Sequence, residues 1–138
     1  MFQIKGAIRL HVIDEGERMI YKNQDLRQRT KAFALRIIHL YSELPKTAIA
    51  QTLGKQVLRS GTSVGAQYRE AQRAKSNADF ISKIEGSLQE LDETEYWLEL
   101  IGESGTMPEE RLKPLIEETN ELIAIFVTIV IKVKARRK

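Results

Sequence analysis

The chain contains no cysteine and only two histidines, His11 and His39. The absence of cysteine excludes a disulfide framework, a thiolate zinc site and a cysteine nucleophile, and it fits a reducing, cytoplasmic compartment. One histidine within the expected helices is too few for a histidine-based metal site. We expect His39 to be a half-exposed helix residue rather than a base. The composition therefore predicts no cofactor, no metal and a protein that binds rather than catalyses.

Glycine, proline and long apolar runs are also scarce. Eight glycines and three prolines in 138 residues argue against a loop-rich or sandwich fold. The longest apolar run extends from Leu122 to Ile131 and is interrupted by Thr128. It is about half as long as the roughly 20 residues needed to span a bilayer. The N-terminus has no continuous apolar signal core. We therefore expect no membrane association.

Charged residues make up 30% of the chain, and their signs are segregated along it. Residues 1–78 carry 14 Lys/Arg against 6 Asp/Glu, residues 79–123 carry 3 against 13, and residues 124–138 carry 5 against none. In one interpretation, acidic and basic helices neutralise each other within the bundle or between subunits. In the other, the basic elements share a face that meets phosphate groups.

Four segments repeat their apolar residues at steps of three and four, the spacing of one helical face. They cover residues 24–44, 47–74, 77–103 and 106 to the C-terminus. Ser76 and Asp79 resemble a capping box, and Pro114 predicts either a later helix start near Leu112 or a kink. The connections are short, so the sequence predicts an all-α, antiparallel up-down four-helix bundle at residues 21–134 with a basic tail at 135–138.

Gly54, Gly61 and Gly65 lie on one stripe of the second segment. Each glycine costs a helix about 1 kcal/mol relative to alanine, so a stripe of them indicates close approach by another backbone. The alternative is a break near Gly61 that divides the segment into two helices.

Residues 1–20 differ from the periodic segments that follow them. Apolar residues from Ile4 to Ile13 suggest a short strand-like piece. Gly16 to Met19 can be encoded by a purine-rich stretch before a start codon, so one hypothesis makes Met19 the biological start. The alternative is a genuine N-terminal hairpin or arm.

The apolar run in the last segment predicts contact between subunits. A helix that is apolar all round is buried on more than one side, which a bundle of this size does not provide. We therefore expect a homo-oligomer with Ile125, Val127 and Ile131 at its interface.

Two carboxylates are candidates for buried ion pairs. Glu95 lies on the apolar stripe between Leu91 and Leu98, where a carboxylate needs a buried partner. Arg59 or Arg69 of the second segment is the expected partner. Glu70 is the second candidate.

Two clusters of basic residues are candidate contacts for RNA or DNA. They comprise Arg59, Arg69, Arg73 and Lys75 in and after the second segment, and Lys132, Lys134, Arg136 and Arg137 near the C-terminus. Tyr68 lies beside the first cluster and would allow base stacking. The alternative for the second cluster is a solubilising tail that offsets the helix dipole.

Several motifs resemble those of a known family. They are Gln56-Val57-Leu58-Arg59-Ser60-Gly61-Thr62-Ser63, Tyr68-Arg69-Glu70-Ala71, Phe80-Ile81-Ser82-Lys83 and Leu88-Gln89-Glu90-Leu91-Asp92-Glu93-Thr94. The chain from about Asp25 to Val133 resembles the bacterial four-helix-bundle proteins named after the 23S rRNA intervening sequence. It departs from their pattern at Gln67, where the family usually has asparagine.

This resemblance implies an up-down bundle assembled into a homo-oligomeric ring, typically a pentamer, without catalytic activity. It implies a role with RNA or other nucleic acid. A related branch implies the alternative of a protein-interaction scaffold or an accessory subunit, for example for a reverse transcriptase. The matching positions, implied to hold the fold and ring or to bind, are Arg59, Ser60, Ser63, Arg69, Glu70 and Glu93.

Overall fold

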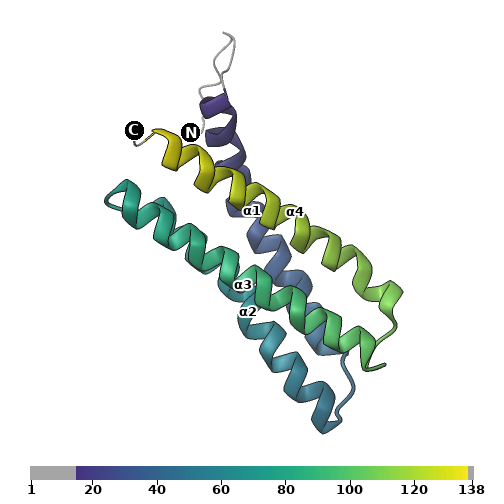
Figure 1. The fold of residues 1–138 in the computed structure, drawn as a ribbon. Helices are drawn as coiled ribbons and strands as arrows, with labels where there is room; N and C mark the ends of the chain where they lie inside the picture. Colours follow the sequence, from purple (N-terminus) through teal and green to yellow (C-terminus); the bar gives the residue numbers. More distant parts are fainter. Residues whose placement is uncertain (1–14, 137–138) are drawn as a thin grey trace.

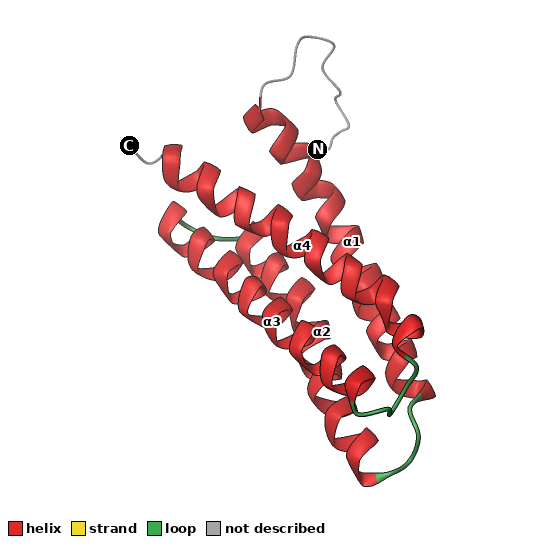
Figure 2. Ribbon diagram, turned by 45° about the vertical axis from the view of Figure 1, so that its right-hand side comes forward, coloured by secondary structure: helices red, strands yellow, loops and turns green. Residues whose placement is uncertain are grey.

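Four helices account for most of the described chain. The computed structural model describes residues 15–136, and it describes side chains from Leu26 to Arg136. The helices are α1 (Glu15–Glu43), α2 (Ala48–Gln72), α3 (Asn77–Glu103) and α4 (Glu109–Arg136), and residues 15–136 contain no strand (Figure 1, Figure 2). The predicted all-α fold with four helices is therefore confirmed.

Contacts between neighbouring helices show how the helices run. On α2 and α3, Ser60 lies beside Thr94, Val64 beside Ser87 and Glu70 beside Lys83. The residue numbers rise on one helix while they fall on the other, so these two helices run in opposite directions. The same holds for α1 and α4, because Arg29 pairs with Glu118 and Glu43 pairs with Arg111.

Polar side chains and one glycine define the helix ends. The Thr47 hydroxyl accepts a hydrogen bond from Ala50 N–H at 3.2 Å, and the Ser76 hydroxyl accepts one from Asp79 N–H at 3.0 Å. Each satisfies a backbone donor that the first helical turn leaves open. After α3, Gly105 adopts a φ of 76°, a conformation that glycine takes without steric cost. The predicted bounds of α3 are confirmed.

Two helix starts differ from the prediction. α1 begins at Glu15 rather than near Gln24, so its first turns lie in the stretch assigned to an N-terminal extension. The expected strand-like residues 4–13 lie outside the described residues. α4 begins at Glu109, after Pro108, rather than at Thr106 or Leu112. Pro114 is accommodated in the second turn of the helix, where it removes one backbone hydrogen bond.

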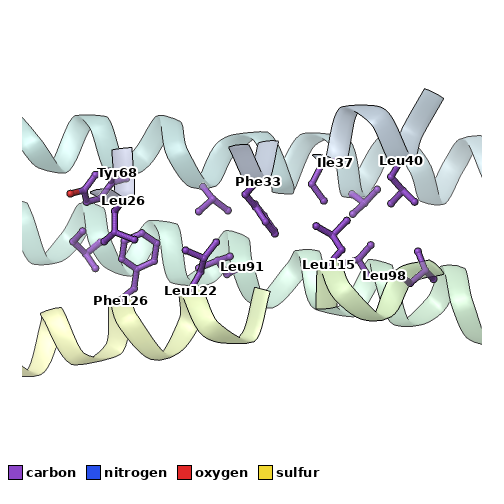
Figure 3. Close-up of a cluster of buried hydrophobic side chains, with 14 of the residues drawn as sticks. Leu26, Phe33, Ile37, Leu40, Tyr68, Leu91, Leu98, Leu115, Leu122 and Phe126 are labelled. Carbon is purple, nitrogen blue, oxygen red and sulfur yellow. The ribbon is translucent and has the colours of Figure 1, made fainter. Parts of the chain in front are cut away.

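The core fills the space between all four helices (Figure 3). Tyr68 of α2 and Phe126 of α4 are fully buried, with ring centroids 5.7 Å apart. Leu91 and Leu122 are also fully buried, and Phe33 reaches the same layer from α1. Apart from Tyr68, these core residues lie on the apolar faces that the helical spacing predicted.

Close packing against α1 explains the glycine stripe on α2. A methyl group at Gly61 would lie 2.7 Å from Ile37 Cγ1, and one at Gly65 would lie 3.0 Å from Thr30 Oγ1 and 3.6 Å from the Thr30 carbonyl carbon. α1 thus occupies the space that larger residues would need. α2 is continuous through Gly61, so the alternative of a break there is wrong.

Buried hydroxyl groups connect α2 to α3. Thr94 Oγ1 lies 2.8 Å from Ser60 Oγ and 2.8 Å from the Glu90 carbonyl oxygen. Ser87 donates a hydrogen bond of 3.0 Å to the Val64 carbonyl oxygen. All three hydroxyl residues are fully buried, and their small side chains allow the two helices to pack closely.

The seam between α1 and α4 is more open than the other helix–helix contacts. Arg29 crosses it, with Nε 2.7 Å and Nη2 2.8 Å from the two carboxylate oxygens of Glu118, and Nη2 2.6 Å from Glu121. These hydrogen bonds, those to Glu118 above all, raise the pKa of Arg29 above its ordinary value. The seam is therefore held by charge as well as by the core.

Candidate nucleic-acid interface

The helix directions bring three basic segments to one end of the bundle. Figure 1 shows the end of α4 and the α2–α3 turn at the same end. Contacts agree, because Arg27 of α1 donates a 3.0 Å hydrogen bond to Gln72 at the end of α2, and Lys134 of α4 lies 3.5 Å from Glu85 near the start of α3. We name this surface the basic end; its cations are Arg27, Arg69, Arg73, Lys75, Lys132, Lys134 and Arg136.

The end of α2 and the turn that follows it supply three of these cations. Arg69 is half-buried in the last turn of α2, and Arg73 caps that helix. Arg73 and Lys75 are exposed. Cations at a helix C-terminus complement its partial negative charge, which accounts for Arg69 and Arg73 locally. Their side chains also place positive charge where α2 ends.

The last turns of α4 supply the second group. Lys134 and Arg136 are exposed, and Lys132 is half-buried. The helix continues to Arg136, so these residues project from an ordered helix rather than from a separate tail. Arg137, a predicted contact, lies outside the described residues.

Carboxylates at the basic end are fewer than the cations, and each has a local contact. Glu70 lies 3.0 Å from Lys83 Nζ, and this hydrogen bond raises the pKa of Lys83 above its ordinary value. Glu85 lies beside Lys134, and Asp79 accepts a 3.4 Å hydrogen bond from Lys75 N–H. The basic end therefore keeps an excess of positive charge.

Arg59 lies away from the basic end. It contacts two carboxylates of α3, at 3.3 Å to Glu90 and 2.5 Å to Glu93. This places it near the middle of the α2–α3 pair, beside Ser60 and Thr94. The structure therefore does not bring Arg59 together with the other predicted basic contacts.

The expected buried ion pairs at Glu95 and Glu70 are wrong. Thr94, not Glu95, takes the fully buried position on α3, and Glu95 is only half-buried. Glu70 is exposed and pairs with Lys83. The buried face of α3 steps from Leu91 by three to Thr94 and by four to Leu98, so the polar Thr94 takes the core position and Glu95 lies beside it.

Tyr68 cannot serve as a stacking platform for bases in this structure. It is fully buried against Phe126 (Figure 3), although it lies beside the first basic cluster in the sequence. Burial raises the pKa of Tyr68 above its usual range. The aromatic residue next to Arg69 is therefore part of the core.

The three predicted interface residues of α4 have different environments. Ile125 is half-buried and packs against the core. Val127 is 40% exposed and Ile131 is 63% exposed. Two of the three are therefore accessible apolar side chains.

Arg27 is the basic-end residue that the sequence prediction missed. Its position follows from the helix order, because an early residue of α1 must lie near the end of α2 and the end of α4. The order and directions of the helices therefore indicate the position of Arg27, whereas no local sequence motif does.

The other end of the bundle is acidic. A groove of about 550 Å³ between the end of α3 and the start of α4 has Leu98, Gly102, Leu112 and Ile116 among its lining residues. Five glutamates and one lysine also line it, namely Glu99, Glu103, Glu109, Glu110, Glu117 and Lys113. Positive and negative charge are thus separated along the bundle.

Residues 15–136 contain no helix with the length and apolarity required to cross a bilayer. The described side chains contain no group of three or more His, Cys, Asp or Glu residues arranged to hold a metal ion.

Comparisons with known proteins agree with the fold. A family model described as "23S rRNA-intervening sequence protein" matches residues 22–128. A crystal structure of a protein with unknown function from the S23 ribosomal protein family of Bacteroides thetaiotaomicron is similar, with a TM-score of 0.75 and 38% identity over 79% of this chain and 97% of that chain. No curated protein matches. The chain therefore belongs to the family of 23S rRNA-intervening sequence proteins.

Proposed function

We propose that this protein is a non-catalytic homo-oligomer that binds RNA or other nucleic acid through the basic end. The observation that carries the proposal is the convergence of cations from α1, the α2–α3 turn and α4 on one end of the bundle. Clustered Lys and Arg side chains neutralise phosphates and release condensed counterions, which supplies most of the affinity of non-specific nucleic-acid binding. Contacts of this kind bind the phosphate backbone of a nucleic acid and do not read its base sequence directly.

Structured RNA is the first ligand to test. The family's name refers to an intervening sequence of 23S rRNA, and the similar protein comes from a family named for a ribosomal protein. Two described aromatic residues lie near the basic-end cations: Tyr68 is fully buried, and Phe80 is half-buried and packs against the core. We therefore propose contacts to the phosphate backbone of a folded RNA rather than stacking on single-stranded bases.

Four carboxylates of α3 and α4 pair with arginines of neighbouring helices. Glu90 and Glu93 pair with Arg59, and Glu118 and Glu121 pair with Arg29. Each pair joins neighbouring helices. We propose on this basis that they stabilise the bundle rather than act on a substrate.

Oligomerisation forms part of the proposal. Val127 and Ile131 are large apolar side chains exposed on α4, and a repeated copy of the chain would remove them from water. A ring, as implied by the family resemblance, would also repeat the basic end around an axis. Repetition increases affinity for an extended polyanion through effective concentration.

Fluorescence anisotropy with a labelled RNA hairpin tests binding at the basic end. Arg73→Glu with Lys75→Glu reverses two exposed cations there and should weaken binding at least roughly tenfold at low salt. The matched control is Lys46→Glu with Lys113→Glu, which makes the same change in net charge at exposed positions of the other end. Equal affinity of both double variants, or no binding by the wild-type chain at low salt, would rule the proposal out.

A further inference from the structure

The outer side of the α3–α4 pair carries a row of carboxylates. Glu85, Asp92 and Glu99 repeat every seven residues on α3, and Glu103 follows one turn later. They therefore lie on one side of the helix. Both ends of the row meet α4, because Glu85 contacts Lys134 while Glu99 and Glu103 line the groove with Ile116.

An apolar row of α4 runs beside these carboxylates. Ile116, Ile123 and Val127 are spaced by seven and four residues, and Lys134 follows Val127 by seven. Ile116 lines the groove with α3, and Lys134 contacts α3, so the row between them borders α3 throughout. Ile131 belongs to the same side and is 63% exposed. The 550 Å³ groove forms one end of this surface, and we name the two rows together the α3–α4 groove.

α1 has a complementary outer surface. Arg27, Lys31, Leu35 and Ile38 are spaced by four, four and three residues, so they form one ridge. Leu35 is 57% exposed and Ile38 is 46% exposed. The described side chains of α1 include a single carboxylate, that of Glu43. We name these four residues the α1 ridge.

We propose that the α1 ridge of one copy docks in the α3–α4 groove of a second copy. Lys31 of the ridge then lies beside the acidic row of α3, and Leu35 and Ile38 cover Val127 and Ile131. Arg27, at the end of the ridge, remains part of the basic end. Helices pack ridges into grooves at an angle, which allows one helix to meet both rows at once. Charge complementarity favours the α1 ridge as the occupant of the groove. The ridge has exposed apolar side chains beside cations, and the groove has exposed apolar side chains beside carboxylates.

The two surfaces lie on different sides of the bundle, so the contact between copies is heterologous. Each copy would offer a ridge to one neighbour and a groove to the next. Repetition of such a contact gives a ring when the rotation closes. The inference rests on the homo-oligomer proposed above and specifies which residues hold it together.

Light scattering after size-exclusion chromatography tests the apolar part of the contact. The wild-type chain should have a mass several times that of one 15.8 kDa chain. Leu35→Lys and Ile131→Lys should each weaken association at least roughly tenfold and yield single chains. Ile49→Lys is the matched control, because Ile49 is 65% exposed and lies on neither surface. A wild-type chain that remains single, or the same mass for Leu35→Lys as for the control, overturns the inference.

Charge reversal tests the pairing of ridge with groove. Lys31→Glu and Asp92→Lys should each weaken association, because each places like charges together. The chain that carries both changes should recover its assembly, since every interface then pairs two reversed charges. Circular dichroism of each variant verifies that its helices form. A double variant that associates no better than the singles contradicts the proposed pairing.

Crosslinking provides direct evidence for the contact and separates it from the RNA proposal. The chain has no native cysteine, so Ile38→Cys with Val127→Cys and a bismaleimide reagent should produce a ladder of linked chains. Ile49→Cys with Val127→Cys should produce none. If the ladder forms but RNA does not bind, the interface stands and the proposed RNA binding fails. If RNA binds a single chain, the proposed RNA binding at the basic end stands and the interface fails.

Discussion

Ser60 Oγ and Thr94 Oγ1 lie 2.8 Å apart at the fully buried contact between α2 and α3. A buried polar group without a partner costs about 1–3 kcal/mol, whereas removal of both partners together can be nearly neutral. Thr94→Val removes the hydrogen bond to Ser60, but Ser60 keeps its 3.4 Å hydrogen bond to the Val57 carbonyl oxygen, so the free energy of unfolding should fall by only about 0.5–1.5 kcal/mol. Urea denaturation followed by circular dichroism measures the change.

The double variant is the control for this pair. Ser60→Ala with Thr94→Val should cost less than the sum of the two single changes, because both hydroxyls are removed together. Additive costs would show that the two hydroxyl groups act independently.

Gly61→Ala should destabilise the protein even though alanine favours helix. The added methyl group would lie 2.7 Å from Ile37 Cγ1, and overpacking typically costs about 1–3 kcal/mol. The gain in helix propensity is about 1 kcal/mol and opposes it. We expect a lower midpoint in urea, and Gly61→Ala should cost less in a chain that also carries Ile37→Ala, which removes the Cγ1, Cγ2 and Cδ1 atoms that the added methyl group would meet. A more stable Gly61→Ala chain would contradict the observed packing of α1 on α2.

Most of the fold was predictable from the sequence, because the helical spacing of apolar residues reports burial directly. α3 has its predicted bounds, and the glycine stripe faces α1. Which of two adjacent residues of a helix faces the core was less predictable. Glu95 and Thr94 are adjacent, and only the packing of α2 against α3 decides which of them is buried.

The candidate site was predicted only as separate segments. Arg73 and Lys134 belong to different helices, and their location at one end depends on the directions in which the helices run. Local sequence also could not show that Arg59 is engaged by Glu90 and Glu93, because those carboxylates come from α3. Tertiary contacts therefore decide which cations share a surface.

Arg29 should contribute to stability in a manner that depends on salt. It contacts both Glu118 and Glu121 across the α1–α4 seam, and its side chain is 30% exposed. Arg29→Gln should lower the free energy of unfolding by about 1 kcal/mol at low ionic strength. The effect is smaller than that of a fully buried ion pair because solvent screens the charges. The cost should be smaller in 1 M salt.

Arg36→Gln is the matched control for Arg29. Arg36 is an exposed arginine on the same helix, so its replacement should change the urea midpoint little. Equal effects of the two substitutions, or an Arg29→Gln cost that does not change with salt, would exclude an electrostatic role for Arg29 at this seam.

Tyr68 should make the protein less stable in alkaline solution. Burial raises the pKa of Tyr68 in the folded state above the value of about 10 that it has in the unfolded chain. Its contribution is therefore fully present below pH 10 and is lost as the pH rises above that value, since the unfolded chain releases the proton more readily.

Tyr68→Phe isolates that contribution, because phenylalanine does not ionise. The stability of the wild-type chain relative to this variant should be constant from pH 7 to about pH 9 and should fall above about pH 10. Urea denaturation at each pH measures both chains. A difference that stays constant up to pH 11 would show that Tyr68 is ionised as easily in the folded state as in the unfolded chain.

Photocrosslinking to a folded RNA hairpin, with the modified peptides identified by mass spectrometry, tests the central claim most directly. The account predicts adducts in the peptides that contain Arg73, Lys75, Lys134 and Arg136, and their loss when excess unlabelled RNA is added. Adducts concentrated at the acidic end, around Glu103 and Glu110, or distributed evenly over the bundle would contradict it.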